Sequence, residues 1–151
     1  LMALAFTLAS SPSSSGENAR AALTVLNSFI FFGLFFGRID SDIINQVHEI
    51  AKEYQCVLVC LDSNHTHDHV LAELEAYAPL TSVDSYCCVF DTLIEDLPHE
   101  MFPDRPWGKG DNPKTAVWQY LKNHPEFEID TNITSKLLIT VAPDGYLRRV
   151  K

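Results

Sequence analysis

Basic residues are scarce in this sequence. Its 151 residues include 11 Lys and Arg against 20 Asp and Glu, which gives a formal net charge of -9. Proteins that bind nucleic acid neutralise its phosphates with clustered Lys and Arg. The acidic excess therefore argues against a nucleic-acid partner, although it does not identify the partner that the protein has.

Phosphate-binding and cysteine-pair motifs are also missing. The six glycines form neither the G-x-G-x-x-G pattern of dinucleotide sites nor a P-loop. The four cysteines, Cys56, Cys60, Cys87 and Cys88, lie in apolar runs and form no C-x-x-C pair. One interpretation of them is a redox pair or a zinc site. The simpler one is four reduced core thiols in a cytoplasmic protein.

Residues 1–38 form an atypical leader, and four interpretations of it stay open. An apolar start followed by small residues is typical of a signal peptide, but no basic segment precedes it. Residues 21–37 carry no charge and come close to the minimum length of a membrane span. A buried strand over residues 28–36 is the simplest alternative, and a truncated or misread coding sequence is the fourth. We expect no membrane role.

From residue 39 onward the pattern is that of an α/β domain. Periodic apolar residues predict helices at about residues 41–54, 67–78 and 113–123. Apolar runs predict strands at residues 56–61, 86–91, 127–129, 137–141 and 146–150. The order indicates the second half of a doubly wound sheet, incomplete at its N-terminus, with an antiparallel final strand pair. The first two strands, joined by a helix, are expected to be adjacent and parallel.

Each of these first two strands ends on an aspartate, Asp62 or Asp91. In open α/β sheets, ligands bind beyond the carboxyl ends of the strands, and the ends of neighbouring strands lie about 5 Å apart. Two carboxylates that close repel each other unless a cation or a proton lies between them. Oxygen ligands favour Mg²⁺ or a similar ion, with Glu95 and Asp96 as further candidates. The alternative is that both aspartates only cap the helix or turn that follows.

Three histidines follow Asp62 at alternate positions. His65 lies in the same loop as Asp62, and a neutral imidazole there can serve as a general base or as a ligand. His67 and His69 fall on the first turn of the next helix, where their side chains diverge. We therefore expect His65 to be catalytic and the other two to be ordinary surface histidines.

A long loop over residues 92–111 is rich in proline, glycine and charge. The part from Phe102 to Asp111 is expected on the same side of the sheet as the two aspartates. Its length, its glycines and Trp107 are typical of a lid over a binding site. An ordinary surface loop is the alternative.

Residues 39–151 also resemble the cephalosporin hydroxylase family, which includes rhamnosyl O-methyltransferase-like members. The resemblance rests on the segments VLVCLDSNHTHDHVLAELEAYAPL, YCCVFDTLIEDLP, FPDRPWGKGDNPKTAVWQYL and KLLITVAPDGYL. It implies a Rossmann-like sheet of the class I S-adenosylmethionine-dependent methyltransferase type. It also implies a metal site at the positions matched by Asp62 and Asp91. Where some relatives carry a further carboxylate this chain has Phe90, so that Glu95 or water would complete the site.

Methyltransferases of this class hold S-adenosylmethionine with a glycine-rich loop after the first strand and an acidic residue at the end of the second. Residues 1–38 show neither, so the cofactor-binding residues stay unassigned and weak cofactor binding by this chain alone is expected. The resemblance implies a metal-assisted O-methyltransferase, or a hydroxylase, that acts on a hydroxyl of a small molecule or sugar. The alternatives are a non-catalytic fragment that binds a partner or completes a split enzyme, and a membrane-anchored domain. Self-association stays open.

Overall fold

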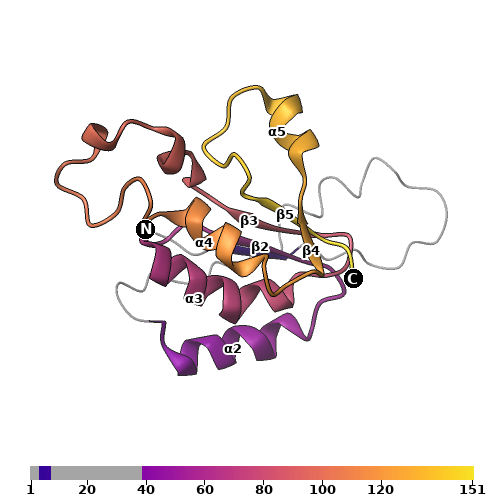
Figure 1. Ribbon diagram of the computed structural model, residues 1–151. Coiled ribbons are helices and arrows are strands. Elements are labelled where there is room, and N and C mark those ends of the chain that lie inside the picture. The colour runs from indigo at the N-terminus through magenta and orange to yellow at the C-terminus, as the bar shows by residue number, and fades with distance from the viewer. Residues whose placement is uncertain (1–3, 8–38) are drawn as a thin grey trace, which may run out of the picture.

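The computed structural model describes residues 4–7 and 39–151, which form a mixed α/β fold (Figure 1). One sheet has the strand order β1-β2-β3-β5-β4. Its strands are β1 (Leu4–Thr7), β2 (Val57–Leu61), β3 (Tyr86–Val89), β4 (Phe127–Ile129) and β5 (Tyr146–Arg149). β2 and β3 are adjacent and parallel. This confirms the prediction for the two strands that precede Asp62 and Asp91.

The strand β5 runs against both of its neighbours. It pairs antiparallel with β3 on one side and with β4 on the other. The expected hairpin of residues 137–141 with 146–150 is therefore not formed, and the last strand instead pairs antiparallel with β4 and β3 and lies between them. On the far side, β1 pairs antiparallel with β2. The strand expected at 28–36 and the candidate membrane segment at 21–37 fall outside the described residues.

Two of the helices begin at a residue whose side chain caps the first turn. α2 (Ser41–Ala51) follows Asp40, whose side chain accepts hydrogen bonds from two backbone N–H groups of the first turn, at 2.8 and 3.4 Å. α4 (Pro113–Tyr120) follows Asn112, which forms a capping box. Such caps satisfy N–H groups that have no partner within the helix. α3 (His67–Tyr77) lies between them in the chain.

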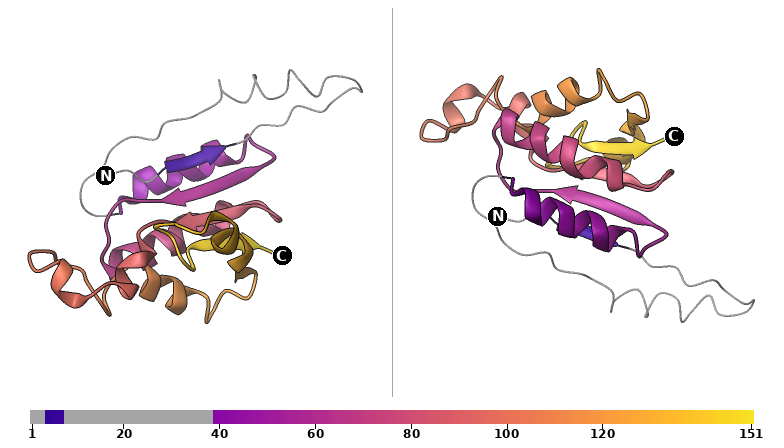
Figure 2. Two further views of the ribbon diagram at one scale, coloured as in Figure 1. Left: turned by 90° about the horizontal axis from the view of Figure 1, so that it is seen from above. Right: turned by 90° about the horizontal axis from the view of Figure 1, so that it is seen from below.

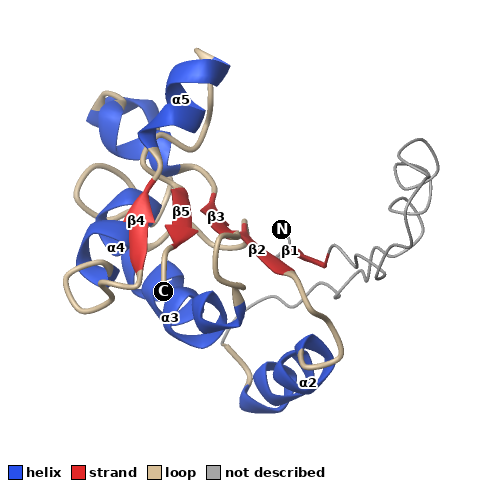
Figure 3. Ribbon diagram, turned by 90° about the vertical axis from the view of Figure 1, so that its right-hand side faces the viewer, coloured by secondary structure: helices blue, strands red, loops and turns tan. Residues whose placement is uncertain are grey.

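The helices α2, α3 and α4 lie on one side of the sheet, and the short helix α5 (Thr131–Leu137) lies on the other (Figures 1 and 3). The view from below shows α2 and α3 in front of the strands (Figure 2). His48 Nε2 of α2 lies 2.7 Å from the carbonyl oxygen of Ala76 in α3. The main core fills the space between the sheet and the helices α3 and α4. Its members include Val57, Val59, Leu61, Val70, Leu74, Cys87, Val89, Ala116, Val117, Tyr120, Phe127 and Leu147.

The prediction of a strand at residues 137–141 is wrong. α5 ends at Leu137, and the next residue, Leu138, has a φ of 64°, which an extended strand does not allow. Leu138 and Ile139 are 87% and 90% exposed. The apolar, β-branched composition of this run indicated a buried strand, but composition carries no information on the turn at Leu138. β5 pairs with β3 and β4 instead.

The four cysteines, Cys56, Cys60, Cys87 and Cys88, are free thiols. Cys60 and Cys88 are direct neighbours across β2 and β3, and Cys87 is fully buried. No group of metal-ligating side chains in the described part of the chain includes a cysteine. These observations support the simpler interpretation of core thiols.

Within residues 4–7 and 39–151, no helix has the length and apolar character needed to cross a bilayer.

Tyr120 of α4 offers a test of the core. Its ring stacks on His124 at 3.8 Å between centroids, while its hydroxyl is buried without a hydrogen-bond partner among the described residues. Burial raises the pKa of this phenol. Tyr120→Phe keeps the ring contacts and removes an unpaired polar group, so we expect the free energy of unfolding to stay equal or rise by up to ~1 kcal/mol. Urea unfolding at constant m-value measures the change, and a loss above ~1 kcal/mol would reveal a bonded hydroxyl.

Candidate metal centre and active site

The carboxyl ends of β2 and β3 bring Asp62 and Asp91 together. Leu61 and Val89, the last residues of the two strands, are paired in register. Asp62 follows β2 directly, and Asp91 follows β3 after one intervening residue. The parallel pairing therefore places both carboxylates at the same edge of the sheet, as the sequence predicted.

His65 joins these two aspartates in one cluster. One oxygen from each carboxylate and one imidazole nitrogen lie within 4.8 Å of one another. His65 Nε2 is 3.0 Å from Asp91 Oδ2 and 3.9 Å from Asp62 Oδ1. The side chain of Asp91 is 34% exposed, that of Asp62 39% and that of His65 16%. The cluster therefore lies at a partly solvated edge of the sheet and not in the core.

Neither carboxylate makes a capping hydrogen bond, which argues against the capping interpretation. Asp91 has a left-handed backbone, with φ of 55°, and occupies the N-cap position of the 3₁₀ turn η3 (Thr92–Asp96). Its side chain makes no capping hydrogen bond there. The N-cap of α3 is Thr66, four residues beyond Asp62. Both carboxylates are consequently free of the role that most often accounts for an aspartate at such a position.

The cluster is electrostatically unbalanced. Burial raises the pKa of Asp62, and the neighbouring charge of Asp91 raises it further. Burial lowers the pKa of His65, against the opposing effect of Asp91 and Asp62. The short approach of His65 Nε2 to Asp91 lacks hydrogen-bond geometry, so this buried nitrogen has no hydrogen-bond partner in the part of the chain that the structure describes. A cation between the carboxylates would relieve their repulsion.

The donor set fits a hard divalent ion. Two carboxylate oxygens are the ligands that Mg²⁺ and Mn²⁺ favour, and an imidazole nitrogen suits Mn²⁺ and other transition ions. Phe90 contributes no ligand, as expected. The third potential ligand atom is supplied by His65 and not by Glu95.

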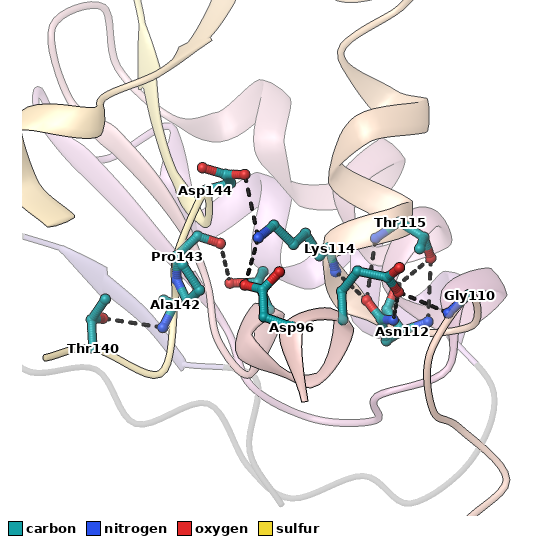
Figure 4. A network of polar contacts seen from close by, with 11 residues as sticks. Asp96, Gly110, Asn112, Lys114, Thr115, Thr140, Ala142, Pro143 and Asp144 are labelled. Atoms are coloured by element: carbon teal, nitrogen blue, oxygen red, sulfur yellow. Dashed lines mark hydrogen bonds and ion pairs between the residues drawn. The ribbon is translucent and has the colours of Figure 1, made fainter. Parts of the chain in front are cut away.

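The candidates Glu95 and Asp96 are engaged elsewhere. Glu95 Oε2 accepts hydrogen bonds from Gly110 N and from Asn112 Nδ2. Asp96 pairs with the buried ammonium of Lys114 at 2.8 Å, and Asp144 lies 3.5 Å from the same nitrogen. These contacts tie the segment after β3 and the turn before β5 to the start of α4 (Figure 4). Neither Glu95 nor Asp96 belongs to the cluster of potential ligands that Asp62, His65 and Asp91 form.

Trp107 in the long loop covers His65. The two rings meet edge to face, with centroids 5.1 Å apart. Phe102 packs on Trp107 at 4.8 Å, and the Arg105 guanidinium lies 5.6 Å from the centre of the same indole ring. The contact places part of the predicted lid against the candidate site.

The other two histidines of the 65–69 segment, His67 and His69, lie on α3, as predicted, and outside the cluster. His67 Nδ1 is 2.7 Å from Thr115 Oγ1 of α4. His69 is not a surface histidine, because its side chain is only 18% exposed and its Nε2 lies 3.0 Å from Ser63 Oγ. Ser63 also donates to Glu73, which is 3% exposed. Sequence analysis missed the roles of Ser63 and Glu73 as partners of His69. The available signal was Glu73, a glutamate directly beside Leu74 in the apolar pattern of a helix.

Comparison with known proteins assigns the chain to a family. Residues 34–150 match the family model described as rhamnosyl O-methyltransferase/CmcI. A rhamnosyl O-methyltransferase of Mycobacterium tuberculosis is 33% identical over 112 residues, which is 73% of this chain and 43% of the relative. One of Mycobacterium leprae is 30% identical over 109 residues, 71% of this chain and 45% of the relative. The chain thus spans less than half the length of these curated relatives. No solved structure gives a significant match.

Proposed function

The chain belongs to the rhamnosyl O-methyltransferase/CmcI family, and we propose that it carries the metal-binding and hydroxyl-activating part of an S-adenosylmethionine-dependent O-methyltransferase. The acceptor would be a hydroxyl of a sugar or another small molecule. The observation that carries this proposal is the cluster of Asp62, His65 and Asp91 at the ends of two parallel strands. The four free thiols support a reducing compartment, the cytoplasm, as its place of action.

In this proposal each residue of the cluster has one role. Asp62 and Asp91 would hold the divalent ion, whose bound charge lowers the pKa of a coordinated hydroxyl. His65 Nε2, buried and without a hydrogen-bond partner in residues 39–151, would take the proton from that hydroxyl. Trp107 shields the imidazole from water on one side. S-adenosylmethionine supplies an electrophilic methyl group, and no described residue is assigned to hold it.

The test is methyl transfer from labelled S-adenosylmethionine to a rhamnosyl glycoside, with Mn²⁺ or Mg²⁺ and with a chelator. Transfer that requires the metal supports the proposal. Transfer that proceeds equally with chelator would contradict the metal role.

A second candidate function is a half-domain that binds a partner or completes a split enzyme. The glycine pattern favours it, because the six glycines form no G-x-G-x-x-G motif for a cofactor. Metal binding without methyl transfer by this chain alone, together with transfer after addition of a complementary N-terminal half, would favour this alternative.

The metal proposal makes a prediction of two opposite effects for Asp62→Asn. The pKa of Asp62 is higher in the folded protein than in the unfolded chain, so the folded state holds this proton more tightly. The metal-free fold therefore loses stability as the pH rises from the pKa of the unfolded chain through the pKa of the folded state. Asparagine removes that penalty, so the metal-free variant should be more stable than wild type at pH 7. Since the side chain is 39% exposed, screening keeps the gain below about 1 kcal/mol.

The same substitution should weaken Mn²⁺ binding by at least ~10-fold, because the amide keeps the shape and loses the charge. Calorimetric titration and thermal unfolding, each with and without Mn²⁺, measure the two effects. Asp104→Asn, an exposed aspartate in the long loop, is the control of equal charge change. Superimposable titrations of wild type and Asp62→Asn would remove Asp62 from the metal site.

A further inference from the structure

Ser63 is fastened by two side chains of α3. Its hydroxyl donates to Glu73 Oε1 at 2.6 Å and lies 3.0 Å from His69 Nε2. Because a hydroxyl has one proton, which here goes to Glu73, the second bond requires His69 to donate from Nε2. Ser63 lies between Asp62 and His65 in the chain, so this hydroxyl anchors the loop that carries both.

In the described part of the chain, no other side chain of this loop forms a hydrogen bond to the body of α3. Ser63 makes the only side-chain hydrogen bonds between residues 62–65 and the body of α3. The Asn64 side chain bonds only Thr66, two residues away. The Ser63 hydroxyl is therefore the side-chain hydrogen-bond link between α3 and the loop that carries Asp62 and His65.

Glu73 is expected to lower the stability of the fold at this buried position. It is 3% exposed, and its Oε2 is buried with no hydrogen-bond partner in residues 39–151. The nearest basic nitrogen, His69 Nε2, is 3.5 Å from Oε1. A buried carboxylate with an unpaired oxygen destabilises a fold relative to a well-packed apolar side chain. Stability alone thus gives no reason for a glutamate beside Leu74.

We propose that Glu73 is a positioning residue of the metal centre, whose carboxylate acts through the Ser63 hydroxyl to fix the loop that carries Asp62 and His65. Its role in metal binding rests on the proposed function. The order of the loop does not, because it is a property of the metal-free chain.

The experiment compares Glu73→Leu, Glu73→Gln and Ser63→Ala with Glu75→Leu, a glutamate on α3 whose side chain is 55% exposed. Amide hydrogen exchange of residues 62–66 is followed in the metal-free protein, with the amides of β3 as internal reference. Urea unfolding and Mn²⁺ titration complete the set. Glu73→Gln keeps an oxygen acceptor for Ser63 and serves as the conservative rescue.

We expect Glu73→Leu and Ser63→Ala to accelerate exchange of residues 62–66 by roughly 10-fold and to weaken Mn²⁺ binding to a similar extent. In Glu73→Leu the urea midpoint stays equal or rises, which a merely structural role would not produce. The double variant Ser63→Ala/Glu73→Leu should add nothing to the effect of Ser63→Ala, because Ser63→Ala already removes the hydrogen bond to Glu73. Glu73→Gln and Glu75→Leu should behave like wild type.

Wild-type exchange of the loop in Glu73→Leu would overturn the proposal. So would equal acceleration in β3, since the effect would then be global. If wild type binds no Mn²⁺, the proposed function fails, and the exchange measurements still decide the role of Glu73.

Discussion

Gly145→Ala should destabilise the domain by at least ~3 kcal/mol and lower its melting temperature by roughly 10 °C or more. A Cβ atom at this position would lie 2.1 Å from the carbonyl oxygen of Val89 and 3.2 Å from side-chain atoms of Thr92 and Ala142. The first contact is with backbone and cannot be relieved by a rotamer change. Gly145 also accepts the hydrogen bond of Val89 N at 2.8 Å, so a shift would separate β3 from the turn before β5.

Thermal and urea unfolding of Gly145→Ala against Gly108→Ala test this expectation. At Gly108 an added Cβ meets only His99 Nδ1, at an ordinary 3.8 Å, so that variant should change stability by less than ~0.5 kcal/mol. Equal stability of the two variants would show that the turn at Gly145 adapts. Because Val89 lies two residues before Asp91, we also expect Gly145→Ala to weaken metal binding in whatever fraction stays folded.

His65→Ala should reduce the rate of methyl transfer by roughly 10²-fold or more, while Mn²⁺ affinity stays within about twofold of wild type. The reason is that we assign the proton to Nε2 and the metal to the two carboxylates. The measurement requires a form of the protein that transfers methyl groups. His99→Gln, at an exposed histidine of the 3₁₀ turn η4 (His99–Met101), is the control. A fall in Mn²⁺ affinity of 10-fold or more would make His65 a ligand instead of the base.

The pH profile gives a second measure of the same assignment. Burial lowers the pKa of His65 below its ordinary value, against the pull of the two carboxylates. The imidazole then stays neutral, and able to accept a proton, to a lower pH than a free histidine. In wild type the acidic limb of kcat/KM should lie below pH ~6.5, and it should disappear in His65→Ala.

The two strands that carry the site were accessible to sequence analysis because they are uninterrupted apolar runs. Val57–Leu61 and Tyr86–Val89 needed only their composition and the helix between them to be placed side by side. Asp62 and Asp91 then followed from the geometry of parallel strand ends. The caps Asp40 and Asn112 are also local features, because a cap acts on the turn that follows it.

What sequence analysis missed depends on contacts between distant positions. The close approach of Gly145 to Val89 joins residues that are far apart in the chain, and no local pattern marks it. The hydrogen bond from Asn112 Nδ2 to Glu95 is of the same kind, and it engages a residue that the sequence offers only as a candidate for completing the metal site. The hydrogen bonds of Ser63 to His69 and Glu73 join residues that are nearer in sequence. Three polar side chains that contact one another produce no periodic pattern in the sequence, so these bonds could not be predicted from it.

The position of β5 has a consequence for the nascent chain on the ribosome. β5 is synthesised after both β3 and β4, yet it lies between them in the sheet. Its first residue follows the end of β3 by about 57 positions, a delay on the order of 3–11 s at ordinary rates of translation. Through that interval β3 presents an unpaired edge, the feature of incomplete sheets that recruits other chains. We therefore expect the emerging polypeptide to depend on chaperones that shield such edges until Tyr146–Arg149 arrive.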